Sequence, residues 1–494
     1  MRRGLAWLLA LLLCLAPAAV LAAKPQATNT PSPYPEATLP KDAPEYDPDH
    51  PEDLVTEQLY AWSAVLIEAD TGKVIFEKNA DDIRYPASTT KIMTVFLGIV
   101  MMDSLDFDVT VSETAAAVNN TDDDISSMNL QAGEVIGYED LLYGTMLLSA
   151  NDGANVIAET VAGSIENFVD LMNRMAQTMG CTNTHFANPH GLHDDAHYTT
   201  PRDLAVITWH AMQNETFASI AGTKSWTIAK TNLHRARTAV NTNELFNPGT
   251  EEKPNKNYYP RAIGVKTGFT SPAQYCFVGA AEKDNVNLIS VVMYTGKRAR
   301  WADTIKLMDY GFSQYVSITP VDLYNMNPMT IEISSYATDD ANMGRLPLIC
   351  RPSEEAAAED IRIVATQEEI ELKARNLKET VLIQYTRDFQ APVDAGEVMG
   401  TMTYFLEDGT PAVYYLTASR SIAKRANAPK TLDQIVAETY ADPNPLPPFS
   451  VDLLLIFLTP LALVFLIGWL IGRHRRKVRH RRRQTPRITH RYLK

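Results

Sequence analysis

Hydrophobic and polar positions follow different periods along the chain, and the first regular block begins with strands. Two short apolar runs, at residues 64–67 and 74–76, flank a turn signal at 70–73. This pattern predicts two strands joined by a tight turn. The run 91–100 is apolar at helical length, and helical patterns dominate from there to about residue 213. We therefore expect a pair of strands followed by a long helical region.

The strand pattern returns in the second half of this block. Residues 262–265 are apolar, and the runs 276–281 and 286–294 predict a hairpin because the polar residues 283–285 separate them. A helical pattern over 300–312 closes the block. The order of strands, helices, strands and helix predicts an α+β fold. We expect an antiparallel sheet built from both ends of the block, flanked by helices and interrupted by an inserted helical region.

Short alternating runs follow from about residue 318, as at 330–333 and 361–364. Residues 402–405 and 412–415 predict a further hairpin, because an Asp-Gly dipeptide between them favours a tight turn. The change in pattern predicts a small all-β domain over 318–435, separate from a first domain at 56–317.

Both ends of the chain carry segments of unusual composition. Residues 1–23 join two arginines to a leucine-rich run and small residues, which is typical of a secretory signal peptide. Residues 24–55 include eight prolines and predict a disordered spacer. A second proline-rich stretch, 436–450, predicts a linker to the apolar segment 451–472. The last twenty residues of that segment carry no charge and are long enough for a transmembrane helix.

The formal net charge of −14 is unevenly distributed. Residues 473–494 hold 11 Lys and Arg and no acid, which predicts a cytoplasmic tail behind a single membrane span. Without these residues and two N-terminal arginines, 32 basic residues face 59 acidic ones, a charge near −27. So acidic an exported part argues against a nucleic-acid partner. The cysteines after residue 23 (Cys181, Cys276 and Cys350) are too few, and odd in number, for a disulfide framework or a Cys-rich metal site.

The first candidate for chemistry is Ser88-Thr89-Thr90-Lys91, at the start of the helix predicted over 91–100. Residues three apart share a helix face, so the Lys91 amine can lie beside the Ser88 hydroxyl and act as its base. A helix N-terminus also offers backbone N–H groups where an oxyanion develops. The spacing alone is weak, because Ser421 and Lys424 repeat it in the predicted β domain.

Two further motifs follow. Ser149-Ala150-Asn151 comes after an apolar helical run, where a hydroxyl and an amide can relay a proton and hold a peptide carbonyl. A helix cap at Ser149 is the simpler reading, and Ser127-Met128-Asn129 matches the same pattern. Lys266-Thr267-Gly268 ends an apolar strand and occurs once in the chain. Its lysine and threonine suit a carboxylate, and its glycine permits a close backbone approach.

The combination is more informative than any one motif. Ser-x-x-Lys, Ser-x-Asn and Lys-Thr-Gly occur in this order, 61 and then 117 residues apart, which is the signature of the penicillin-recognising serine enzymes. From about residue 60 to 315 the chain resembles the low-molecular-mass penicillin-binding proteins of the serine D-alanyl-D-alanine carboxypeptidase family, peptidase family S11. The stretches that carry the resemblance are 85–94, 188–192, 197–200 and 264–270, with weaker echoes at 391–393 and Gly400.

The resemblance implies a penicillin-binding-protein/β-lactamase-like fold and a catalytic role for four residues. Ser88 is expected to attack the carbonyl between the last two D-alanines of a peptidoglycan stem peptide, with Lys91 as base. Ser149 is expected to pass a proton to the departing D-alanine, and Asn151 to orient Lys91 and the substrate amide. β-Lactam antibiotics are expected to acylate the same serine.

The resemblance also implies how the substrate is bound. Lys266 and Thr267 are expected to hold the terminal carboxylate, with Gly268 allowing the substrate backbone to approach. The oxyanion hole is expected from the backbone N–H groups of Ser88 and Phe269. A second carboxylate contact is expected from Arg300, with Arg298 as its rival. No metal or cofactor is implied. Three nearby histidines (His190, His193 and His197) and the Cys276 thiol are expected to be structural.

Two other functions share these motifs. A class A β-lactamase needs a Glu-x-x-Leu-Asn loop for deacylation, and the nearest approach, residues 244–247, has the wrong spacing. A catalytically inactive peptidoglycan-binding protein is the other alternative, and the intact set of motif residues argues against it.

Overall fold

The computed structural model describes residues 38–120, 125–354, 361–406, 409–426, 431–440 and 463–476. The chain divides into two compact units. Among the described residues, the first unit holds the chain up to Met329 together with Ile349–Thr386 and Val398–Thr417. The second unit holds Thr330–Leu348, Arg387–Glu397 and the residues from Ala418 onward. The predicted signal peptide at 1–23 lies outside the described residues.

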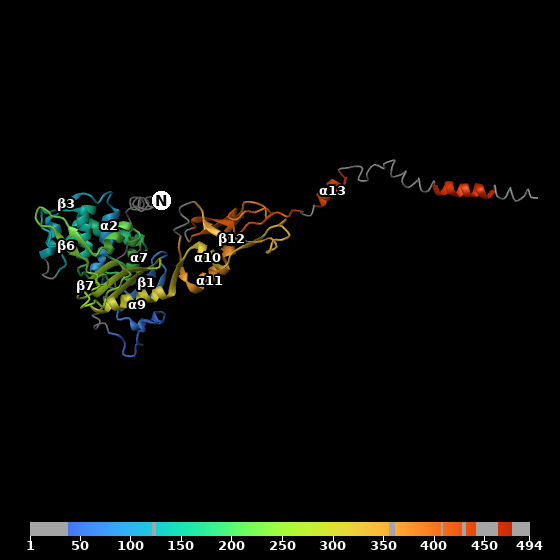
Figure 1. Ribbon diagram of the computed structural model, residues 1–494. Coiled ribbons are helices and arrows are strands. Elements are labelled where there is room, and N and C mark those ends of the chain that lie inside the picture. The colour runs from blue at the N-terminus through green and yellow to red at the C-terminus, as the bar shows by residue number, and fades with distance from the viewer. Residues whose placement is uncertain are drawn as a thin grey trace, which may run out of the picture. The chain divides into compact units, whose positions relative to one another are not determined.

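A five-stranded antiparallel sheet forms the centre of the first unit (Figure 1). Its strands, in spatial order, are β2 (Val74–Lys78), β1 (Ser63–Glu68), β9 (Val286–Thr295), β8 (Gln274–Lys283) and β7 (Ala262–Thr270). The order places the two N-terminal strands beside β9, so the sheet is built from both ends of the block. This confirms the predicted α+β arrangement and the predicted hairpins at 64–76 and 276–294.

The inner strands of this sheet are buried on both faces, which explains why most of their positions are apolar. On β1, Val65 and Ile67 belong to one hydrophobic cluster, whereas Ala64 and Leu66 belong to another. Successive strand residues point to opposite faces, so the two clusters are the two sides of one sheet. One side packs against the helix α9 (Ala299–Gln314) and the other against the helical region, as Figure 1 shows for α2 and α7.

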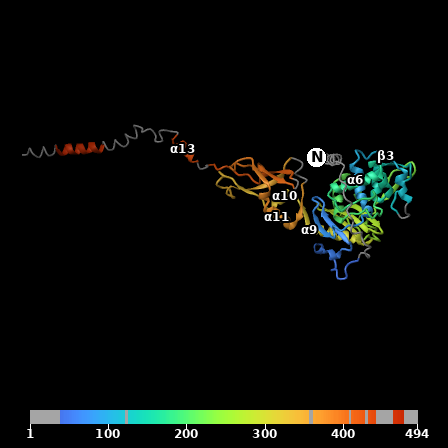
Figure 2. The same ribbon diagram turned by 180° about the vertical axis from the view of Figure 1, so that it is seen from behind.

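The inserted helical region runs between β2 and β7, with α6 visible from behind in Figure 2. Its helices are α2 (Lys91–Val100), α3 (Glu113–Ala116), α4 (Tyr138–Leu147), α5 (Asn151–Ala162), α6 (Ile165–Thr178), α7 (Pro201–Met212) and α8 (Glu215–Gly222). Two antiparallel strand pairs lie within it: β3 (Asp108–Thr110) with β4 (Val135–Gly137), and β5 (Ser225–Ile228) with β6 (Arg237–Val240). Single 3₁₀ turns are η1 (Pro51–Asp53), η2 (Thr56–Gln58), η3 (Ala87–Thr90), η4 (Ala117–Asn120) and η5 (Glu244–Phe246).

The predicted spacer at 24–55 is wrong at its C-terminal end. Leu54 is buried in the cluster on the α9 side of the sheet, and Tyr46 packs against the same cluster. The side-chain amide of Gln58 also donates to the carbonyl of Glu45 at 3.0 Å. Apolar side chains placed between the prolines give this segment a surface to bury, which the proline count alone did not reveal.

The region predicted as an all-β domain, 318–435, contains helices as well, so that part of the fold prediction is corrected. Its helix α11 begins with a capping box, in which Thr366 and Glu369 satisfy each other's backbone N–H groups. The helices of this region are α10 (Pro320–Met326), α11 (Gln367–Arg375), α12 (Leu377–Thr380) and α13 (Leu432–Tyr440). The strands are β10 (Tyr315–Ile318) with β13 (Ile363–Thr366), and a second five-stranded sheet of β11 (Thr330–Glu332), β12 (Arg345–Pro352), β16 (Pro411–Ala418), β15 (Val398–Phe405) and β14 (Leu382–Tyr385).

The C-terminal part of the chain is described only in pieces. Residues 463–476 are helical. In the part of the chain that the structure describes, no helix has both the length and the apolar character that a membrane span requires. The first twelve residues of the predicted span 451–472, and most of the basic tail, lie outside the described residues.

Candidate active site

The site begins at a tight turn in front of α2. Ala87 has a φ of 49°, in the left-handed region that a residue with a Cβ seldom adopts. Ser88 follows in η3, and α2 continues the turn directly from Lys91. Ser88 is only partly buried, and it lies at the N-terminal end of the helical segment. The first N–H groups of such a segment have no helical partner and attract negative charge.

The Lys91 amine is held by three oxygen atoms. Its Nζ lies 3.1 Å from Ser88 Oγ, 2.7 Å from Asn151 Oδ1 and 2.6 Å from the carbonyl oxygen of His190. The side chain is fully buried. Burial, followed by the nearby charge of Lys266, holds the pKa of Lys91 well below that of an ordinary lysine. The amine is therefore favoured in its neutral form.

A neutral Lys91 is arranged to take a proton from Ser88. The amide oxygen of Asn151 and the carbonyl oxygen of His190 can only accept hydrogen bonds, so they occupy the two N–H bonds of a neutral amine. The remaining direction, toward Ser88 Oγ, is left for the nitrogen lone pair. These contacts orient the base, and burial together with the charge of Lys266 lowers its pKa.

The second motif lies at the junction of α4 and α5. Ser149 has a φ of 63°, and Asn151 opens α5 two residues later. Both side chains are buried. The carboxylate of Asp152, one position on, accepts the backbone N–H groups of Met128 and Leu130 at 3.1 and 2.8 Å. Asp152 thereby fixes a neighbouring loop against the first turn of α5, while Asn151 faces Lys91.

The competing pattern at Ser127 has a different role. The Ser127 hydroxyl donates to the Asp152 carboxylate at 2.7 Å and accepts the backbone N–H of Asn129 at the same distance. Asn129 is exposed. This serine and asparagine therefore shape the loop that Asp152 holds, and they do not contact Lys91.

The third motif lies on β7, beside the turn that carries Ser88. A Cβ added at Gly268 would lie 3.0 Å from the carbonyl oxygen of Pro86 and 3.2 Å from the backbone nitrogen of Ser88. Glycine is needed here because a larger residue would push the strand away from the nucleophile. The Thr267 hydroxyl lies 2.7 Å from that of Thr242, whose backbone N–H donates to Leu147 at the end of α4. Thr242 therefore connects the third motif to the end of α4, two residues before Ser149.

Two buried cations lie near each other, Lys266 on β7 and Arg300 on α9. Lys266 is 1% exposed, and burial followed by the charge of Arg300 lowers its pKa to about 7. Arg300 is 8% exposed and forms no hydrogen bond or ion pair through its side chain with another described residue. Arg298 is exposed instead. Two buried cations without a carboxylate between them are costly alone and suit an anionic ligand.

Residues that the motifs did not reveal also hold the nucleophile turn. The backbone N–H of Ala187 donates to His197 Nδ1 at 3.0 Å, so the proton of this imidazole lies on Nε2, 2.7 Å from the Thr90 hydroxyl. Thr90 in turn donates to the carbonyl oxygen of Ala87 at 2.8 Å. Burial lowers the pKa of His197 to about 3, which keeps it neutral. These hydrogen bonds therefore end at Ala87, the residue with positive φ directly before Ser88.

The other polar side chains near the site have local partners. His190 Nδ1 accepts the backbone N–H of Leu192 at 3.2 Å, and the His193 ring packs edge-on against Tyr85. Among the described residues, no cluster of three or more His, Cys, Asp or Glu side chains could hold a metal ion. Cys276 is fully buried, and burial raises the pKa of its thiol to about 11, so it stays protonated.

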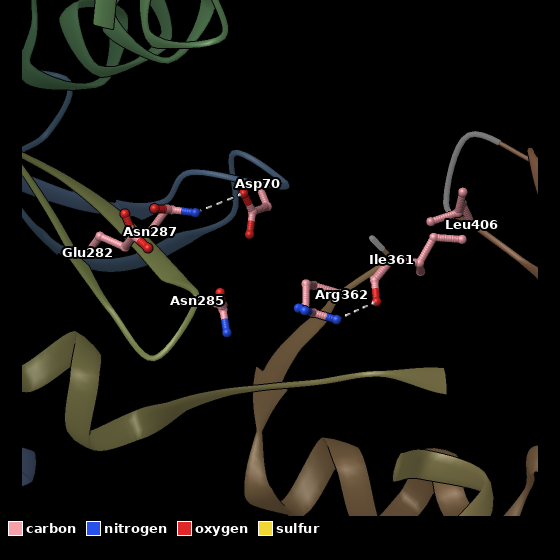
Figure 3. A pocket seen from close by; sticks show the side chains of 7 residues that line it. All are labelled: Asp70, Glu282, Asn285, Asn287, Ile361, Arg362 and Leu406. Carbon is pink, nitrogen blue, oxygen red and sulfur yellow. Dashed lines mark hydrogen bonds between the residues drawn. The ribbon is translucent and has the colours of Figure 1, made fainter. Parts of the chain in front are cut away.

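A hollow of about 490 Å³ in the first unit lies elsewhere and includes none of the motif residues (Figure 3). Figure 3 shows Asp70 bound to Asn287, and Arg362 bonded to a neighbouring backbone carbonyl. The hollow is lined by Asp70, Glu282, Asn285, Asn287, Ile361, Arg362 and Leu406. Its mixed, open lining does not resemble the buried site at Ser88.

Comparison with known proteins gives consistent similarities. The family model of the D-alanyl-D-alanine carboxypeptidases, peptidase family S11, matches residues 50–296. The D-alanyl-D-alanine carboxypeptidase DacF of Bacillus subtilis is 31% identical over 371 residues, which cover 74% of this chain and 86% of that protein. A D-alanyl-D-alanine carboxypeptidase of a Streptomyces species is 35% identical over 257 residues, 49% of this chain and 84% of that protein. The crystal structure of the Streptomyces K15 DD-transpeptidase is 34% identical with a TM-score of 0.47, covering 53% of this chain and all of that chain.

Proposed function

The chain belongs to the peptidase S11 family of serine D-alanyl-D-alanine carboxypeptidases, and we propose that Ser88 is its nucleophile and Lys91 its general base. The enzyme removes the terminal D-alanine from peptidoglycan stem peptides through an acyl-enzyme, and penicillin acylates the same enzyme covalently. The observation that carries the assignment of residues is the buried Lys91 amine, held within 3.1 Å of Ser88 Oγ by two acceptors that fix its lone pair.

Acylation proceeds from this geometry. Ser88 Oγ bonds to the carbonyl carbon between the last two D-alanines while Lys91 Nζ takes the hydroxyl proton. Ser149 then passes its proton to the nitrogen of the departing D-alanine as the C–N bond breaks, and takes in its place the proton that Lys91 received from Ser88. The backbone N–H groups of Ser88 and Phe269 stabilise the negative oxygen of the tetrahedral intermediate. Water later cleaves the ester, and its proton returns to Ser88 Oγ.

The substrate carboxylate is assigned to the two buried cations. Neither Lys266 nor Arg300 forms an ion pair with another described residue, and the hydroxyl of Thr267 lies on the same strand as Lys266. A terminal carboxylate supplies the missing negative charge and gains charge-assisted hydrogen bonds. Gly268 brings the strand close to the Ser88 turn, so a substrate that binds along β7 reaches the nucleophile. The buried Arg300, rather than the exposed Arg298, is the second carboxylate contact.

We also propose that the enzyme is held at the cell membrane by its C-terminal segment, with the catalytic domain outside and the basic tail in the cytoplasm. The support is in the sequence: twenty uncharged residues at 453–472 followed by 11 Lys and Arg without an acid. Protease treatment of intact cells tests the orientation. A cleaved catalytic domain with a protected tail epitope is expected, and a protected catalytic domain would overturn the topology.

The function is tested with two substrates on the same purified protein. A stem pentapeptide is expected to lose one D-alanine catalytically, whereas a labelled penicillin is expected to remain bound as a stable adduct. Rapid turnover of the penicillin together with an inert pentapeptide would indicate a β-lactamase instead. If no adduct forms and no D-alanine is released, the protein only binds peptidoglycan and is not an enzyme.

A further inference from the structure

The Arg300 guanidinium is held by aromatic rings. Its Cζ lies 4.9 Å from the ring centroid of Tyr275 and 4.4 Å from that of Trp301. Its Nε is buried without a hydrogen-bond partner among the described residues. Aromatic faces attract a cation but carry no net charge. They therefore restrain the guanidinium and leave its positive charge available, which a carboxylate in the same place would not do.

Tyr275 is built into the same pair of strands as the Lys-Thr-Gly motif. It lies on β8 directly opposite Phe269, the residue that follows the motif on β7. The two rings are 4.4 Å apart and inclined by 31°. Phe269 is 48% exposed and Arg300 8% exposed, so the stack leads from the protein surface to the buried cation.

We propose that Tyr275 is a positioning residue that holds Arg300 beside Lys266 and so determines the preference for substrates with a free terminal carboxylate. This rests on the proposed function, in which Lys266 and Arg300 bind that carboxylate. Phe269 supports the position by covering the outer face of the Tyr275 ring. Trp301, the next residue on α9, is 1% exposed and packs on Phe277 in the core. Its ring also contacts the Arg300 guanidinium.

The alternative position of Arg300 explains why the ring is needed. Glu244, on η5, is the carboxylate that acts electrostatically on Arg300. Asn257 holds this carboxylate at 2.5 Å, so it is a fixed acceptor. Without the Tyr275 ring, the guanidinium is free to move toward Glu244 and pair with it. Such a pair would neutralise half of the charge offered to the substrate and leave the chemistry at Ser88 intact.

The test compares two forms of one substrate, a stem pentapeptide with a free terminal carboxylate and the same peptide as its C-terminal amide. Tyr275→Leu is expected to raise KM for the free acid about tenfold with kcat little changed, and to leave kcat/KM for the amide unchanged. Tyr275→Phe keeps the ring and is expected to match the wild type. Phe269→Leu is expected to give a smaller rise in KM. Tyr258→Leu, at an exposed tyrosine outside the stack, is the matched control.

Active protein is counted in every variant by saturating labelling with penicillin, so a misfolded variant is recognised. If Tyr275→Leu does not fold, the proposal is decided by Phe269→Leu and Tyr275→Phe. An unchanged KM for the acid in the ring-deleting variants, or equal losses on acid and amide, would overturn the role of Tyr275. A wild-type enzyme that does not distinguish acid from amide would overturn the proposed carboxylate pocket itself, which is a different result.

Discussion

Two segments of this chain place a serine three residues before a lysine, and they fold differently. Ser88 and Lys91 lie on a helical turn, where residues three apart share a face, and their polar atoms are 3.1 Å apart. Ser421 and Lys424 lie in irregular, bridge-forming chain, with Ile422 bridging Val393 and Lys424 bridging Tyr336. In extended chain, residues three apart point to opposite sides.

Burial separates the two segments further. Lys91 is enclosed and its pKa is lowered, whereas Lys424 is exposed. The Ser421 hydroxyl is occupied as an acceptor for the backbone N–H of Ala395 at 2.9 Å. The difference shows that the spacing of Ser and Lys becomes a catalytic pair only when a helical turn brings them together and burial keeps the amine neutral.

The largest effect is expected from removing the Lys91 amine, with the Lys424 amine as its matched comparison. Lys91→Met is expected to slow acylation by penicillin by about three orders of magnitude, because the base is lost while the nucleophile remains. Lys424→Met, the matched change in the second segment, is expected to leave the rate unchanged. Stopped-flow measurement of the acylation rate constant decides this. A Lys91→Met enzyme within tenfold of the wild type would contradict the assignment of the base.

A pH profile sharpens the comparison between a buried lysine that acts as a base and one that acts as a cation. The pKa of Lys266 is lowered to about 7, so its charge is present below that pH and lost above it. For the free-acid pentapeptide, kcat/KM is expected to fall above about pH 7 by up to tenfold per unit, until Arg300 alone binds the carboxylate. Lys266→Arg keeps its charge and is expected to remove this fall. The prediction is wrong if the profile of that variant declines as the wild type does.

The smallest effect is expected from the bonds behind the nucleophile turn. Thr90→Val removes the donor to the Ala87 carbonyl and leaves the His197 N–H unsatisfied, at a cost of about 1–2 kcal/mol. Acylation is expected to slow by about tenfold, and Thr90→Ser to restore it. Thr208→Val deletes a hydroxyl of equal burial that bonds only within α7, and is the control. Equal losses in both valine variants would show a general packing effect.

The sheet and the motif positions were predictable because their signals are local. Two apolar strands around a polar turn, and a hairpin at 276–294, depend on periodicity, and the structure confirms both. The region after residue 318 was predicted less well, because α11 is a short polar helix whose start depends on the capping pair Thr366 and Glu369. A nine-residue helix with few apolar positions gives a weak periodic signal.

Only the part of the site that is formed by the side chains of recognisable motifs could be predicted from the sequence. The residue types of the three motifs were sufficient to name Ser88, Lys91 and Lys266. The carbonyl of His190, which orients Lys91, is a backbone atom, and any residue supplies one. Thr242 and Tyr275 matter through partners far along the chain, Leu147 and Arg300, and no local pattern relates them. Long-range packing supplies these contacts.

The most direct measurement is the mass of the enzyme after incubation with penicillin, for the wild type, Ser88→Ala and Ser421→Ala. We expect one penicillin per chain in the wild type and in Ser421→Ala, attached to the peptide that contains Ser88, and none in Ser88→Ala. D-Alanine release from the pentapeptide is expected to follow the same pattern. An adduct that persists in Ser88→Ala, or that maps to another residue, would contradict the account.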